Sequence, residues 1–138
     1  QALHHALATI TPRGPDALLV VLADVPAMVP ADIDAVLDAL PAGRGLVICP
    51  STAKGTSVLG LRPPDVIPFR FGPGSFMLHR REAAARGIPA NVLRIDSLAH
   101  DVDEVEDLRY ILSQPAGAAT HRLLDDIGIA ERLSAGKP

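Results

Sequence analysis

The sequence has few of the features that mark secreted, membrane-spanning or nucleic-acid-binding proteins. Its 138 residues include one cysteine, Cys49, so no disulfide can form within the chain and a cytoplasmic location is expected. The longest apolar run, residues 17–23, is far too short to cross a bilayer. A formal net charge of -3 gives no basis for a general affinity for nucleic acid. Neither a nucleic acid nor a membrane is therefore expected as a partner.

The chain does contain an alternation of buried-strand and amphipathic-helix patterns. The run "ALLVVLA" is typical of a strand buried on both faces, whereas Ile33, Val36, Leu37 and Leu40 follow the spacing of one helix face. Strands are expected at residues 17–23, 45–49, 57–61 and 91–95, and helices at residues 1–10, 31–40, 76–86 and 104–113. This alternation predicts an α/β fold in a single domain, residues 1–138, with a mostly parallel sheet in a three-layer sandwich.

Three aspartates are candidates for a metal site. Asp24 directly follows the first buried run, so it should lie at the edge of the sheet where such folds bind ligands. Asp101 and Asp103 are two residues apart, so in an extended chain both carboxylates point to one side and offer the oxygen ligands that Mg²⁺ prefers. Structural alternatives exist: Asp24 suits a turn in "ADVP", and Asp103 with Glu106 resembles a capping box. Both interpretations hold together if Asp101 binds the metal while Asp103 caps the helix.

A glycine-rich loop is a candidate anion site. In "FGPGSF", Gly72 and Gly74 leave backbone N–H groups uncovered, and Ser75 stands where a helix begins. Loop amides at a helix N-terminus bind phosphate or carboxylate groups. The alternative is that Ser75 is only an N-cap and that the glycines only shape a turn.

A second loop of small residues, "STAKGTS" at residues 51–57, has a similar character. Lys54, Gly55 and Thr56 are placed to meet an anion there, although the spacing of a P-loop is absent. No Ser/His/Asp order and no metal-type Cys/His spacing stands out elsewhere. Cys49, at a strand end, is expected to be packed rather than reactive.

These segments together resemble one enzyme family. The run "PSTAKGTSVLGLRPPDVIPFRFGPGSFMLHRREAAARGIP", with "LADVPAMVPADI" before it and "AHDVDEVEDL" after it, is similar to the guanylyltransferases of coenzyme F420 biosynthesis, which use 2-phospho-L-lactate or phosphoenolpyruvate. The segment "RPPDVIPFRFGPGSF" is quite specific, whereas "ADVP" and "DVD" are shared by many nucleotidyltransferases. The resemblance implies a Rossmann-like nucleotidyltransferase fold. It also implies transfer of GMP from GTP to the phosphate of a small phospho-acid, with release of pyrophosphate.

The resemblance further implies roles for individual residues. Asp24, Asp101 and Asp103 would hold Mg²⁺ and act as the catalytic residues. The phosphate and carboxylate of the acceptor would contact a second set: Thr56, Gly72 and Ser75, together with Gly55 and Gly74. Because the attacking phosphate oxygen is already ionised, catalysis would rest on alignment and charge neutralisation rather than on a general base.

The sequence departs from the family pattern in two places. The loop after Pro50 often carries Arg, Asp, Gly and Asn in this family. The corresponding residues here are Thr52, Ala53, Lys54 and Ser57. Related nucleotidyltransferases also begin with a strand and a Gly-rich loop that holds the triphosphate, and nothing before Asp24 matches it. With Gln1 inside an expected helix, this predicts a chain that lacks its N-terminal third and much of the GTP side of the site.

Two other functions remain open at this point. One is a different nucleotidyltransferase, of molybdopterin or sugar-phosphate type. The other is a truncated, non-catalytic domain that binds an acidic phospho-metabolite. Truncation would leave a sheet edge or a core face exposed, which would favour self-association as a homodimer.

Overall fold

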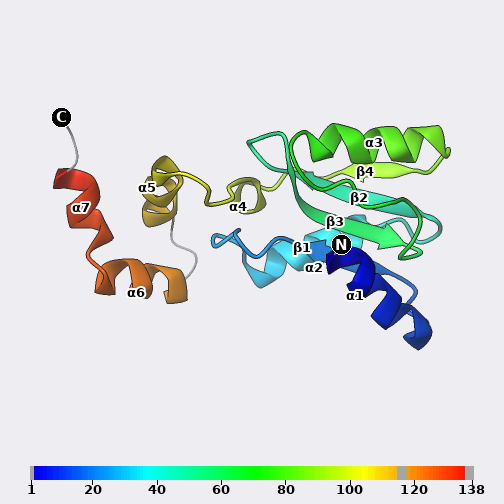
Figure 1. Ribbon diagram of the computed structural model, residues 1–138, viewed down its shortest axis with the longest axis horizontal. Helices are drawn as coiled ribbons and strands as arrows, with labels where there is room; N and C mark the ends of the chain where they lie inside the picture. The colour runs from blue at the N-terminus through cyan, green and yellow to red at the C-terminus, as the bar shows by residue number, and fades with distance from the viewer. Residues whose placement is uncertain (1, 115–117, 136–138) are drawn as a thin grey trace.

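The computed structural model describes residues 2–114 and 118–135, and it shows four strands with helices on both faces (Figure 1). The strands are β1 (Leu18–Val21), β2 (Gly45–Pro50), β3 (Thr56–Arg62) and β4 (Ala90–Val92). The helices are α1 (Ala2–Ile10), α2 (Pro30–Ala39), α3 (Ser75–Ala85), α4 (Asp96–Ala99), α5 (Val105–Ser113), α6 (Ala118–Asp126) and α7 (Ile129–Ala135), and a 3₁₀ turn, η1 (Thr11–Arg13), follows α1. Each expected strand and helix is present within a few residues of its expected position, so the α/β class is confirmed.

The sheet is mixed, and the prediction of a mostly parallel sheet was wrong. Its strand order is β1-β3-β2-β4, and β3 runs antiparallel to both β1 and β2, whereas β2 and β4 pair in parallel. The cause lies in the loop between β2 and β3, residues 51–55, which contains no helix. A loop this short returns the chain antiparallel, because parallel neighbours need a crossover of roughly a dozen residues or more.

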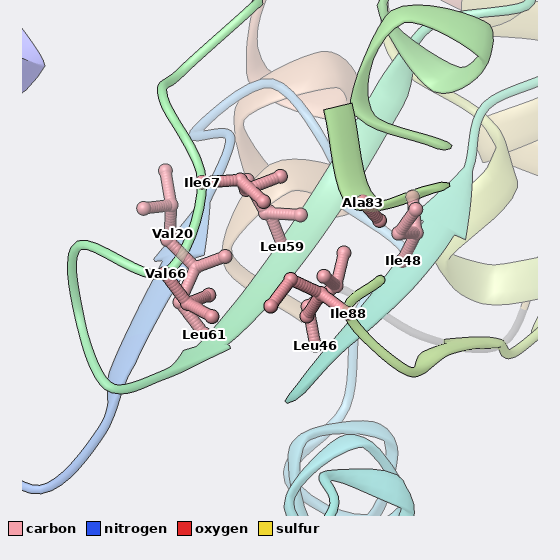
Figure 2. Close-up of a cluster of buried hydrophobic side chains, with 9 residues drawn as sticks. All are labelled: Val20, Leu46, Ile48, Leu59, Leu61, Val66, Ile67, Ala83 and Ile88. Atoms are coloured by element: carbon pink, nitrogen blue, oxygen red, sulfur yellow. The ribbon is translucent and has the colours of Figure 1, made fainter. Parts of the chain in front are cut away.

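Strand β2 separates two apolar layers, because successive side chains on a strand point to opposite faces. Leu46 and Ile48 point to the face covered by α3, and Val47 and Cys49 point to the face covered by α2 and α4. The first cluster, shown in Figure 2 with its side chains pointing toward one another, consists of Val20, Leu46, Ile48, Leu59, Leu61, Val66, Ile67, Ala83 and Ile88. The second consists of Val25, Val36, Leu40, Val47, Cys49, Val58 and Leu98. The expected three-layer arrangement therefore holds for this sheet.

Cys49 belongs to the second cluster and is 1% exposed. Burial, followed by the nearby charge of Asp32, raises the pKa of its thiol to about 11. Since a thiol must ionise to act as a nucleophile or a metal ligand, Cys49 is a packing residue, as expected.

The helices after α4 extend beyond the end of the sheet (Figure 1). A small third cluster of Ala27, Ile111 and Leu124 joins α5 and α6 to the segment after β1. In residues 2–114 and 118–135, no helix is both long enough and apolar enough to cross a membrane.

Candidate active site

A cavity of about 490 Å³ lies at the sheet edge where β1 and β2 end and β3 begins. All the predicted site residues except Gly74 line it, namely Asp24, Gly55, Thr56, Gly72, Ser75, Asp101 and Asp103. Leu22, Phe71 and Pro73 add apolar walls, and Ser51 adds a hydroxyl group that the sequence did not single out. Segments that are far apart in the sequence therefore meet at one site.

Two backbone hydrogen bonds place the segment that carries Asp101 and Asp103. The N–H of Thr52 donates to the carbonyl of Ala99 at 2.8 Å, and the N–H of Val102 donates to the carbonyl of Asp24 at 3.0 Å. These bonds tie the segment to the loop after β2 on one side and to the loop after β1 on the other. Because residues 101–103 are not helical, both aspartates line the same cavity, as their i, i+2 spacing predicted.

The capping box predicted from Asp103 and Glu106 was wrong by one residue. Glu104 is the N-cap of α5, and the Asp107 carboxylate accepts hydrogen bonds from the N–H groups of Glu104 at 2.7 Å and Asp103 at 3.0 Å. The hydrogen bond from Glu104, followed by that from Asp103, holds the pKa of Asp107 below its ordinary value. Asp103 therefore takes part in the cap only through its backbone N–H, and Asp103 itself lines the cavity.

The charged groups on the cavity wall are all acidic. The lining within the described residues contains the carboxylates of Asp24, Asp101 and Asp103 and no lysine, arginine or histidine. In that same part of the chain, no group of three or more His, Cys, Asp or Glu side chains lies close enough to hold a metal ion. Mg²⁺ ordinarily binds one or two carboxylates, several waters and substrate phosphates rather than a cage of protein ligands. The donors present therefore fit a cation that arrives with a phosphate ligand.

Two buried hydroxyl groups form the floor of the cavity. Thr56 and Ser75 are each 1% exposed, and the Oγ of Ser75 lies 3.2 Å from the Oγ1 of Thr56. The N-cap of α3 is Gly74, with φ of +70°, so the alternative that Ser75 only caps the helix was wrong. Ser75 is the first helical residue, and its side chain is directed to Thr56 instead of to the helix backbone.

His79 lies beneath this floor and is completely buried. Its Nδ1 is 3.0 Å from the Oγ1 of Thr56, and its Nε2 accepts a hydrogen bond from the N–H of Arg70 at 3.0 Å. Burial lowers the pKa of His79 to about 4. The sequence interpretation gave His79 no role, although its position four residues after Ser75 places both on one face of α3.

The loop after β2 brings a backbone position close to these hydroxyl groups. The N–H of Gly55 donates to the Oγ of Ser51 at 3.1 Å. A Cβ atom at Gly55 would lie 2.8 Å from the Oγ of Ser51 and 4.0 Å from the Oγ of Ser75. Lys54 takes a left-handed conformation with φ of 65° and is exposed, and it does not line the cavity. Gly55 thus has a steric reason to be glycine, whereas the expectation that Lys54 meets an anion finds no support in the cavity wall.

Comparison with known proteins agrees with the motifs. The family described as "Guanylyl transferase CofC like" matches residues 1–137. A phosphoenolpyruvate guanylyltransferase from Sphaerobacter thermophilus is 44% identical over 110 residues, which are 78% of this chain and 53% of the relative. A 3-phospho-D-glycerate guanylyltransferase from Colwellia psychrerythraea is 35% identical over 80 residues, 56% of this chain and 38% of the relative. The chain spans about half the length of the curated relatives it matches.

A solved structure shares the fold. A putative nucleotide-diphospho-sugar transferase from Desulfovibrio desulfuricans G20 superposes with a TM-score of 0.68 at 19% identity. The match covers 92% of this chain and 59% of the other. At this identity the likeness concerns the arrangement of the strands and helices, and it extends over nearly the whole described chain.

Proposed function

The chain belongs to the CofC-like guanylyl transferase family, and from that premise we propose that it transfers GMP from GTP to the phosphate of a three-carbon phospho-acid. The observation that carries the proposal is the meeting, in one cavity, of three carboxylates with two buried hydroxyl groups. The relatives are named for phosphoenolpyruvate and 3-phospho-D-glycerate, and 2-phospho-L-lactate belongs to the same chemical class. In the family that the sequence resembles, this step belongs to coenzyme F420 biosynthesis.

The reaction needs no acid–base pair from the protein. A phosphate oxygen of the acceptor forms a bond to the α-phosphorus of GTP, while the bond from that phosphorus to the departing pyrophosphate breaks. The attacking oxygen is ionised at neutral pH, so no proton has to be removed. The task of the chain is then to align two anionic substrates and to reduce their mutual repulsion.

The three aspartates that line the cavity would repel anionic substrates, so alignment of those substrates requires a cation. Three carboxylates with no basic side chain beside them repel a phosphate and a carboxylate on the acceptor. We propose that the set Asp24, Asp101 and Asp103 would hold Mg²⁺, with one or two of these carboxylates binding it directly and the others acting through bound water, and that substrate phosphates would complete its ligands. When bound, Mg²⁺ would supply neutralisation of the phosphate charge. The backbone bonds around Asp101 and Val102 keep these carboxylates at the cavity in advance.

The remaining polar residues of the cavity supply the groups for the acceptor. We propose that the pair Thr56–Ser75 donates a hydrogen bond to a phosphate or carboxylate oxygen of the acceptor, and that Gly55 and Gly72 let those oxygens approach the backbone. Gly72 has φ of +123°, a conformation that a side chain would strain. Gly74, which does not line the cavity, contributes by forming the N-cap of α3.

The test is release of pyrophosphate from GTP in the presence of Mg²⁺, with phosphoenolpyruvate, 2-phospho-L-lactate and 3-phospho-D-glycerate as separate acceptors. The phosphoenolpyruvate guanylyltransferase of Sphaerobacter thermophilus serves as the positive control for the assay. Release with one acceptor, abolished by EDTA, is expected and would identify the substrate. If the relative is active while this chain releases nothing with any acceptor, the proposed reaction is contradicted.

A further inference from the structure

The hydrogen-bonding state of His79 follows from its neighbours. A backbone N–H can only donate, so the Nε2 of His79, which receives the N–H of Arg70, must be an unprotonated acceptor. A neutral imidazole carries its single proton on the other nitrogen, which here is Nδ1. The lowered pKa of His79 keeps the ring neutral at pH 7. The Nδ1–H therefore donates to the Oγ1 of Thr56.

This donation sets the direction of the remaining hydrogen bonds. Thr56 and Ser75 have two hydroxyl protons between them, and one of these is used in the bond that joins the two oxygens. Because the Nδ1–H of His79 already donates to Thr56, the second hydroxyl proton cannot be donated to the imidazole ring of His79. Within residues 2–114 and 118–135, no further partner is found for either hydroxyl group. Both side chains line the cavity, so this proton is left for a ligand there.

We infer that His79 is a positioning residue, whose Nδ1–H makes the pair Thr56–Ser75 a net hydrogen-bond donor to an anionic oxygen of the acceptor. The opposite tautomer would accept the Thr56 proton and leave the floor of the cavity as a net acceptor, which repels a phosphate or carboxylate oxygen. The floor thus favours an oxygen that carries no proton. The inference rests on the proposed function for the identity of the acceptor.

The environment of His79 supports a fixed ring. Phe71 packs against it edge to face, with ring centroids 5.0 Å apart at 73°. The charged side chains near it are Arg70 and Glu82, and these pair with each other at 2.7 Å. The ring is therefore held by an aromatic neighbour and two hydrogen bonds, and the two nearby charges offset each other.

Two substitutions separate the two hydrogen bonds of the ring. In His79→Asn the shorter amide can place an N–H near the position of Nδ1 and so preserve the donor to Thr56. In His79→Gln the longer amide can place its oxygen near the position of Nε2 and so preserve the acceptor for Arg70, while the donor to Thr56 is lost. The readout is the dissociation constant for phosphoenolpyruvate by calorimetry at pH 7 with Mg²⁺, with circular dichroism to verify folding.

The inference predicts a split between these variants. His79→Gln should weaken phosphoenolpyruvate binding by about tenfold or more, the usual effect of losing a hydrogen bond to a charged group. His79→Asn should stay within about threefold of the unmodified chain, even if its melting temperature falls. Equal weakening in both variants, or weakening in His79→Asn alone, would overturn the inference. If a variant does not fold, the inference is tested instead by NMR spectroscopy on the unmodified chain.

That test reads the tautomer directly. Imidazole ¹⁵N shifts at pH 7 should show His79 as the neutral ring protonated at Nδ1, both without and with phosphoenolpyruvate. A ring protonated at Nε2, or a chain that does not bind phosphoenolpyruvate, overturns the inference. If phosphoenolpyruvate binds with the expected variant pattern while no pyrophosphate is released from GTP, the proposed reaction fails and the role of His79 stands.

Discussion

The N–H of Val102 donates a 3.0 Å hydrogen bond to the carbonyl of Asp24. This bond joins the loop after β1, which carries Asp24, to the segment before α5, which carries Asp101 and Asp103, and all three residues line one cavity. Since no carboxylate takes part in it, the carboxylates can be neutralised without removing the bond that positions them. Loss of activity can therefore be separated from loss of structure at this site.

The first prediction concerns Asp24, Asp101 and Asp103. Changing each to asparagine should lower the turnover with GTP and acceptor by about 100-fold or more, because a charge that holds the cation is lost while the shape is kept. The melting temperature should change little. Asp34→Asn, on the exposed face of α2, is the matched control and should keep normal turnover. Near-normal turnover in all three site variants would rule out the proposed metal site.

The second prediction concerns the start of α5. Asp107→Ala should lower the melting temperature by a few degrees, because the N–H groups of Asp103 and Glu104 lose their acceptor. It should also raise the KM for the acceptor by loosening Asp103. Glu106→Ala, one residue away and exposed, should leave both quantities unchanged. A lower melting temperature in Glu106→Ala but not in Asp107→Ala would support the capping box first expected from Asp103 and Glu106.

The third prediction is a dependence of stability on pH that originates at His79. Its pKa falls from 6.5 in the unfolded chain to about 4 in the folded one, chiefly through burial. Between these values the unfolded state binds a proton that the folded state does not, so the free energy of unfolding decreases as the pH is lowered. The decrease from pH 6.5 to pH 4.5 should be about 2 kcal/mol. Below pH 4.5, Glu82 and Asp107, whose pKa values are lowered, add their own loss of stability.

Urea unfolding at pH 6.5 and at pH 4.5 measures this dependence. His79→Gln should remove most of the difference between the two pH values, whereas His5→Gln, on an exposed position of α1, should retain it. An unchanged difference in His79→Gln would assign the pH dependence to other groups.

The sequence predicted the parts of the site that depend on local pattern. The end of the first buried run predicted Asp24 at the sheet edge, and the i, i+2 spacing predicted that Asp101 and Asp103 face one side; all three line the cavity. The direction of β3 was missed because alternation of strands and helices was assumed, although the loop at residues 51–55 is too short for a crossover. Loop length is itself a sequence feature, and it would have corrected the prediction.

Other features depend on contacts that no local pattern encodes. The cap of α5 moved by one residue because Asp107, rather than Glu106, reaches back to two N–H groups. His79 contacts the site through Thr56, and this contact exists because Thr56 of β3 lies beside the first turns of α3 in the folded chain. Asp24 and Asp101 line the same cavity because a backbone hydrogen bond joins two loops that are far apart in the sequence. Such pairings require the tertiary fold.

The last prediction uses two glycines that differ in their surroundings. A Cβ at Gly55 would lie 2.8 Å from the Oγ of Ser51, a distance that forces one of the two atoms to move, and it would sit 4.0 Å from the Oγ of Ser75. A Cβ at Gly43 would contact nothing within 4 Å. Neither residue has a positive φ, so backbone strain does not confuse the comparison. Any difference between Gly55→Ala and Gly43→Ala therefore reports crowding at the cavity.

Gly55→Ala should raise the KM for the acceptor by about tenfold, because the methyl group displaces the Ser51 hydroxyl and narrows the approach to Thr56 and Ser75. Its kcat should fall less, since the substitution removes none of the three carboxylates that line the cavity. Gly43→Ala should match the unmodified chain in both constants, as steady-state kinetics with varied acceptor would show. An unchanged KM in Gly55→Ala would mean that the acceptor does not reach the loop after β2, and the binding surface would then have to be sought on the α3 side alone.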